Sequence, residues 1–183
     1  MNKLIPLFYL ITGIINTNVD VSDRYITRQG QVTFFSYTNV ENIEAKNNQV
    51  LSVIDFSKNE IAISMLMKAF VFKKALMREH FNESYIESDL YPKATLEGII
   101  LDFDPANRED QTKIVKGKIT IRGITKEVEI KTKITFQEQK YIFSGDFELT
   151  VKDFEIKIPS VLAPNIAKNI SVQFKFEYEP YEL

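Results

Sequence analysis

The chain has 183 residues, of which 44% are hydrophobic, so it is long and apolar enough to form one domain around a sizeable buried core. Lys and Arg number 23 and Asp and Glu number 25, spread along the chain, which leaves a formal net charge of −2 and no basic face for binding nucleic acid. The absence of Cys excludes disulfide bonds, thiolate catalysis and every zinc site that needs a Cys ligand.

The N-terminal stretch MNKLIPLFYLITGIINTN, residues 1–18, has the layout of a secretory signal peptide. Lys3 precedes an apolar run over residues 4–15, which is too short for a comfortable transmembrane helix. Asn16-Thr17-Asn18 lacks the small residues of a usual cleavage site, so the alternative is an uncleaved apolar segment packed on the rest of the fold. We expect residues 1–18 to direct export, residues 19–183 to form a single domain, and no segment to span a membrane.

After this leader, apolar and polar residues alternate, which predicts antiparallel strands with one buried face. The residues that share such a face are Val32, Phe34 and Ser36 in QVTFFSY, Ile61 and Ile63 in EIAISML, Ile119 and Ile121 in TKIVKGKITIRG, and Val172, Phe174, Phe176 and Tyr178 in SVQFKFEYE. The turn-forming residues between such segments are Asn47-Asn48, Ser57-Lys58-Asn59, Asp104-Pro105-Ala106-Asn107, Gly123 and Gln137-Glu138-Gln139. Connections this short make hairpins and therefore predict a meander.

Residues 74–92, KALMREHFNESYIESDLYP, break the two-residue period. Met77, Phe81 and Tyr85 recur at every fourth residue, which places them on one face of a short helix, and Pro92 ends it. We expect this one helical excursion among about eight strands, the number at which a closed barrel has room for side chains or one small ligand.

His80 is the only histidine in the chain. Beside Glu79 or Asp89 it would be the general base of a lipid-modifying enzyme, but a lone His on a helix is more often half-buried and bonded to a backbone carbonyl. The stretch DFDPANRED resembles the start of a calcium loop, yet Ala106 and Asn107 stand where such a loop needs an oxygen ligand and a Gly. We therefore expect a protein that is not an enzyme and that uses no metal or cofactor.

The order of several motifs over residues 25–178 resembles the YceI-like family of polyisoprenoid-binding proteins. The motifs are VTFFSYTNVENIEAKNNQVLSVID, the helical stretch with His80-Phe81 followed by Tyr91-Pro92 and Ala94-x-Leu96-x-Gly98, the hairpin Gly117-x-Ile119-x-Ile121-x-Gly123-Ile124-Thr125-Lys126, and Asp153-Phe154-x-Ile156. Two departures bear on the shape of the interior and on the choice of head group. Leu96 replaces the Phe that is more usual there, and Arg122 stands where a His often precedes the glycine.

This resemblance implies an all-β fold, an extended eight-stranded antiparallel lipocalin-like β-barrel with one short helical excursion. It also implies export to the periplasm, an interior that takes a long isoprenoid or similar alkyl chain, and no catalytic residues. The leading hypothesis is an exported, periplasmic or secreted binding protein that holds a polyisoprenoid or isoprenoid quinone for transport, storage or sequestration.

The residues expected to contact this ligand are the inward-facing side chains of the strands and one face of the helix. The apolar residues are Val32, Phe34, Ile63, Phe72, Met77, Phe81, Tyr85, Ile119, Ile121, Phe147, Phe174 and Phe176, and His80 is the candidate for the head group. One alternative is a filled barrel that acts without ligand as a stress-related interaction protein, and another is the enzyme that uses His80. The sequence leaves open whether the barrel forms a homodimer.

Overall fold

The computed structural model describes residues 23–161 and 163–181, so the predicted signal peptide lies outside the described residues. The strands are β1 (Arg24–Tyr37), β2 (Asn42–Asp55), β3 (Glu60–Leu66), β4 (Val71–Phe72), β5 (Lys93–Ile100), β6 (Gln111–Ile121), β7 (Ile124–Gln137), β8 (Lys140–Thr150) and β9 (Asn169–Pro180). The helical segments are η1 (Met67–Ala69), α1 (Ala75–His80), η2 (Phe81–Tyr85), η3 (Val151–Phe154) and η4 (Ala163–Asn165), of which η2 is a π-helical turn and the other η segments are 3₁₀ turns.

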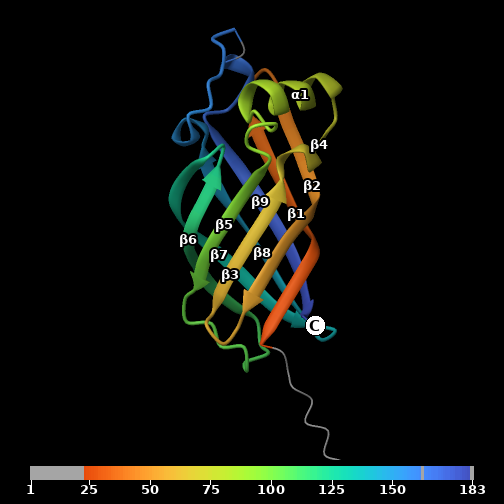
Figure 1. Cartoon of the computed structure of the whole chain (residues 1–183), viewed down its shortest axis with the longest axis vertical. Coiled ribbons are helices and arrows are strands. Elements are labelled where there is room, and N and C mark those ends of the chain that lie inside the picture. The colour runs from red at the N-terminus through yellow and green to blue at the C-terminus, as the bar shows by residue number, and fades with distance from the viewer. Residues whose placement is uncertain (1–22, 162, 182–183) are drawn as a thin grey trace, which may run out of the picture.

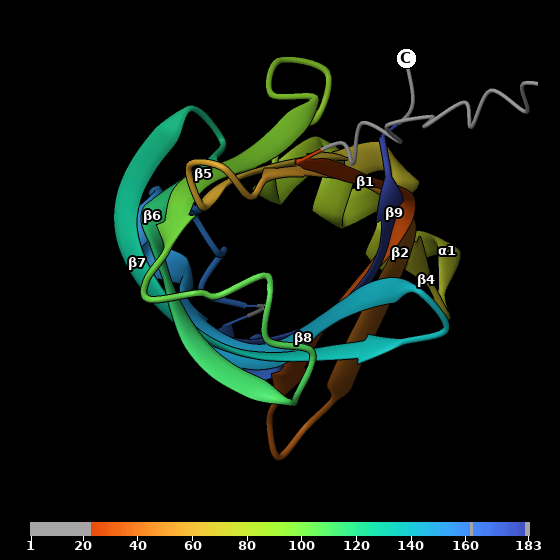
Figure 2. The ribbon, with the colours of Figure 1, turned by 90° about the horizontal axis from the view of Figure 1, so that it is seen from below.

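The strands close into an antiparallel barrel. Each strand pairs with its neighbour in the order β1, β9, β8, β7, β6, β5, β3 and β2, and β1 also pairs with β2, which closes the ring of eight strands seen in Figure 2. The two-residue strand β4 is an addition that pairs with the first half of β2, whereas β3 pairs with its second half. The predicted all-β class, the eight-stranded meander and the single short helical excursion are confirmed.

One expectation is wrong, because Asn47-Asn48 is not a turn but lies inside strand β2. Val32 of β1 pairs with Asn47, whereas Gly30 pairs with Val50, so two residues of β2 lie opposite a single residue of β1 and form a β-bulge. The Asn47 side chain is fully buried, its Nδ2 donates to the Leu66 carbonyl at 3.0 Å, and its Oδ1 accepts from the Gln49 amide at 2.9 Å. These hydrogen bonds replace ladder bonds that the bulge removes.

The lower end of the barrel, where β9 ends in Figure 1, is filled with aromatic side chains. The rings of Phe56 and Tyr141 are 4.8 Å apart, and those of Phe143 and Tyr178 are 5.1 Å apart. Ser52 Oγ donates to the Ala62 carbonyl at 3.0 Å, so the buried Tyr178 hydroxyl donates to Ser52 Oγ at 2.7 Å. With its polar atoms bonded, this cluster closes the lower end.

The upper end is covered by the lid segment, residues 75–88, which includes α1 and η2 (Figure 1). The six residues of α1 lack a side-chain cap at Lys74, so the helix depends on the packing of its inner face rather than on local signals. In η2 the Ile86 amide donates to the Phe81 carbonyl at 2.9 Å, five residues back, which gives the π geometry. Glu87, the next-to-last residue of the lid segment, has a φ of +54°.

Arg122 joins the lid segment to the hairpin between β6 and β7. Its guanidinium forms an ion pair with Glu87 and donates from Nη1 to the Glu155 carbonyl at 3.2 Å. The three residues have φ between +51° and +54°, a left-handed conformation that costs a residue with a side chain about 1 kcal/mol or more. These contacts hold three strained chain reversals together at the upper end.

Candidate functional site

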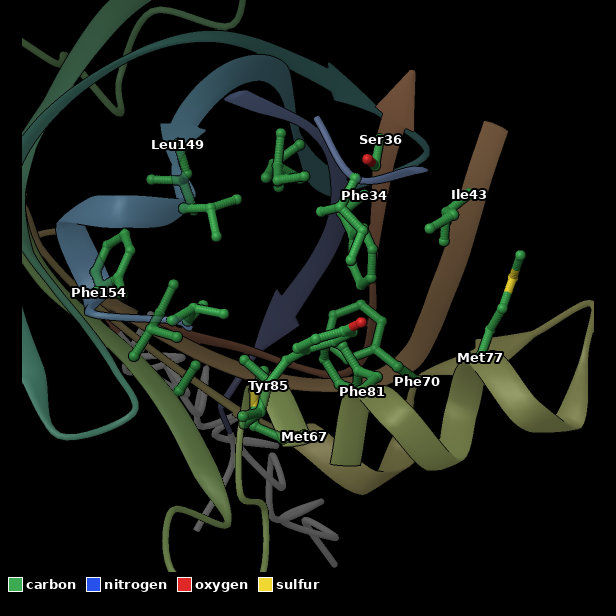
Figure 3. A pocket seen from close by; sticks show the side chains of 18 of the residues that line it. Phe34, Ser36, Ile43, Met67, Phe70, Met77, Phe81, Tyr85, Leu149 and Phe154 are labelled. Carbon is green, nitrogen blue, oxygen red and sulfur yellow. The ribbon is translucent and has the colours of Figure 1, made fainter. Parts of the chain in front are cut away.

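A cavity of about 230 Å³ occupies the upper half of the barrel, between the strands and the lid segment. Its wall combines the upper parts of β1, β3, β6, β8 and β9 with the inner face of the lid segment and the connection between β8 and β9. Figure 3 shows Phe34, Phe81 and Tyr85 on one side of this space and Leu149 and Phe154 on the other. Elements far apart in sequence therefore form one apolar chamber.

The lid segment contributes Met77, Phe81 and Tyr85, the face that the four-residue spacing predicts. Phe81 packs on three rings, with centroid distances of 5.5 Å to Phe34, 5.7 Å to Phe70 and 5.0 Å to Phe72. The Phe34 ring lies nearly parallel to the Phe81 ring, at an interplanar angle of 24°. These aromatic contacts fix the lid segment to β1 and β4 and form one wall of the cavity.

A second, smaller cavity of about 50 Å³ lies below the first, nearer the aromatic lower end. Five apolar side chains border both cavities. These are Val32, Met65, Ile119, Phe147 and Val172. Leu96, one of the two departures from the family pattern, lines the lower cavity. Arg122, the other departure, lines neither cavity and pairs with Glu87 instead.

The structure places every residue predicted to contact ligand on the wall of one cavity or the other. On the upper cavity lie Val32, Phe34, Phe72, Met77, His80, Phe81, Tyr85, Ile119, Ile121 and Phe147. On the lower cavity lie Ile63, Phe174 and Phe176. Their role in binding stays a prediction, since a position on a cavity wall is not contact with a ligand.

Sequence reasoning missed a large part of the upper wall. The missed residues include Met65, Met67, Leu149, Val151, Phe154, Ile156, Ile158, Ile166 and Ile170. Five of them lie between β8 and β9, where the chain has no long regular element and periodicity carries little information. The motif Asp153-Phe154-x-Ile156 was the available signal, because its two apolar residues both reach the cavity.

Few polar groups face the cavity. Ser36 Oγ accepts from the Ala167 amide at 2.8 Å, and Glu41 is ion-paired with Lys74. Partial burial raises the pKa of Tyr85, so its hydroxyl remains neutral at physiological pH. Among the described residues that line the two cavities there is no Lys or Arg. The site suits an apolar chain, and its described walls offer neither a Lys nor an Arg to pair with an anionic group inside.

The surroundings of His80 give little support to the alternative of an enzyme that uses this residue as a general base. His80 lines the upper cavity, but Asp89, one of the two carboxylates considered as its partner, is ion-paired with Lys68. Across residues 23–161 and 163–181, no three His, Cys, Asp or Glu side chains are grouped so as to hold a metal ion. Over the same residues, no helix has both the length and the hydropathy needed to cross a bilayer.

Comparison with known proteins identifies the fold. Residues 20–178 match the YceI-like domain family, while no curated protein matches the chain significantly. Similar solved structures include a polyisoprenoid binding domain from Saccharophagus degradans implicated in plant cell wall breakdown, with 12% identity, a TM-score of 0.75 and coverage of 87% of this chain and 99% of that chain. BcnA from Burkholderia cenocepacia has 14% identity and a TM-score of 0.68, covering 82% of this chain and 96% of that one.

The YCEI protein of Campylobacter jejuni also has 14% identity, with a TM-score of 0.62 and coverage of 80% of this chain and 90% of that one. At these identities the structures demonstrate a shared fold, and the family match extends over nearly the whole barrel. The resemblance identified from the sequence motifs is confirmed, and the chain belongs to the YceI-like domain family.

Proposed function

We propose that this protein is a binding protein that holds the apolar chain of an isoprenoid or quinone type of lipid inside its barrel and catalyses no reaction. The observation that carries the proposal is the cavity of about 230 Å³ with an almost wholly apolar wall. Burial of apolar surface contributes about 0.8 kcal/mol per methylene, so several buried methylenes suffice for binding without an ion pair. The similar structure from Saccharophagus degradans, described as a polyisoprenoid binding domain, supports this class of ligand.

Export forms the second part of the proposal. The signal-peptide layout of residues 1–18 supports a periplasmic or secreted protein, in which residues 19–183 form the binding domain. There the barrel would transport, store or sequester a lipid that water does not dissolve. The N-terminal sequence of the protein isolated from its host tests export, because an N-terminus at Met1 would contradict it.

The first test of binding is mass spectrometry of an organic extract from natively purified protein, compared with an unrelated protein from the same cells. A stoichiometric lipid with an isoprenoid chain is the expected result. If the extract is clean, and remains clean after the protein has been incubated with membrane lipids, the filled barrel without ligand becomes the better explanation.

Two neighbouring residues of β1 offer a matched pair of variants. Phe34 lines the cavity, whereas Phe35 stacks on Tyr37 at 5.6 Å and belongs to neither cavity wall. Phe34→Asp places a carboxylate in the apolar chamber and should weaken binding of a fluorescent isoprenoid by at least about 100-fold, or about 3 kcal/mol. Phe35→Asp should bind within about three-fold of the parent. Equal binding by the two folded variants would contradict the assignment of the cavity as the lipid site.

A further inference from the structure

The lower cavity is bordered by three aromatic rings, which we call the floor. They belong to Phe143, Phe174 and Phe176. The centroids of Phe174 and Phe176 are 5.5 Å apart, and Phe143 packs on the fully buried Tyr178 at 5.1 Å. A ligand chain that enters from the upper end therefore meets side chains that already fill the barrel.

Two glycines make room for this floor. A Cβ at Gly30 would lie 2.4 Å from the Phe176 ring, and a Cβ at Gly145 would lie 2.9 Å from the Phe174 ring. Both rings thus lie directly against the backbone of neighbouring strands and cannot move outward. A ligand chain can therefore pass the floor only if these rings move out of their close-packed positions.

The space above the floor limits how much of a chain fits. A dry apolar cavity of about 150 Å³ holds benzene, which has six carbons. In the same proportion the upper cavity, at about 230 Å³, holds about nine carbons, and the lower cavity, at about 50 Å³, adds about two. The capacity is close to two isoprene units, far less than the whole of a long polyisoprenoid.

We propose that the barrel binds about ten carbons of an apolar chain, and that Phe174 and Phe176 set this limit. The inference rests on the proposed lipid-binding function and makes it more specific. Carbons beyond the limit remain outside the cavity and add no affinity, so the protein recognises one end of a long chain rather than its full length.

Straight-chain primary alcohols of about six to sixteen carbons, titrated into the full chain after its lipid has been extracted, test this limit. The association constant should rise about four-fold with each methylene up to about ten carbons and then hardly change. A continued four-fold gain per methylene up to about sixteen carbons would overturn the limit and leave the lipid-binding function intact. Absence of binding at every length would overturn the function itself, and the limit with it.

Variants of the floor locate the limit. Phe174→Leu removes part of the floor at a smaller packing cost than Ala, and it should move the plateau to longer chains by about one carbon. Phe35→Leu, on the outer face of the barrel, is the control and should leave the plateau where it is. If folded Phe174→Leu has the plateau of the parent, Phe174 does not set the limit.

Discussion

The buried hydroxyl of Tyr178 makes the stability of the folded protein depend on pH. The side chain is fully buried, and burial raises the pKa of its hydroxyl well above the usual value for tyrosine. In the unfolded chain the same group titrates near pH 10, so above that pH the unfolded state loses a proton that the folded state retains. The stability that depends on this proton is therefore complete below about pH 10 and is lost as the pH rises further.

Tyr178→Phe tests this linkage. At pH 7 the variant should be less stable by about 1 kcal/mol, the net value of the hydrogen bond to Ser52, while Ser52 retains its bond to the Ala62 carbonyl. From about pH 10 upward the parent should lose about 1.4 kcal/mol per pH unit through this residue, and the variant should not. Urea unfolding at neutral and alkaline pH measures the difference. The difference in the free energy of unfolding between parent and variant should shrink toward zero near pH 11. The control is Tyr37→Phe, at a residue that is 60% exposed, which should change the free energy of unfolding little at either pH.

The lid segment is held from outside the cavity by Arg122 and Glu87, whose side chains are 20% and 35% exposed. Arg122→Ala leaves the partly buried Glu87 carboxylate without its cation and should destabilise the lid segment by about 1–2 kcal/mol, between the values for exposed and buried pairs. The amides of Ile86 and Ser88, which are bonded to Phe81 and Asn82, should then exchange with solvent about 5–30 times faster.

The control for this variant is the ion pair between Lys116 and Glu129 on β6 and β7, whose side chains are 56% and 63% exposed. Lys116→Ala should change stability by less than about 1 kcal/mol and leave the exchange of the lid amides unchanged. Equal exchange rates in Arg122→Ala and the parent would mean that aromatic packing on Phe81, rather than this ion pair, holds the lid segment in place.

At the scale of the whole molecule, a ligand inside the barrel should stabilise all eight strands together, because its site is built from side chains of most of them. At a ligand concentration about 100 times Kd the free energy of unfolding should rise by about 2.7 kcal/mol. For a chain of this length that corresponds to a Tm increase of roughly 5–10 °C. Thermal unfolding of extracted protein with and without decanol measures this increase, which should vanish in Phe34→Asp and persist in Phe35→Asp.

The sequence by itself determined the orientation of side chains in regular elements. Strand alternation placed Val32, Phe34 and Ile119 on the inner face, and the four-residue spacing placed Met77 and Phe81 on the inner face of the lid segment. Such patterns are reliable because the period of two in a strand and of nearly four in a helix follows from backbone geometry alone. The order of the sequence motifs also predicted the family and, through it, the closed barrel.

Only the tertiary structure decided where the barrel is hollow and where it is filled. Phe34 and Tyr178 both point inward, yet one borders a cavity and the other is closely packed, because free volume depends on the sum of side chains from several strands. The bulge at Asn47 and the pairing of Arg122 with Glu87 likewise depend on partners distant in sequence. Local patterns specify the direction of a side chain, whereas the space it fills and the residue it meets are properties of the assembled fold.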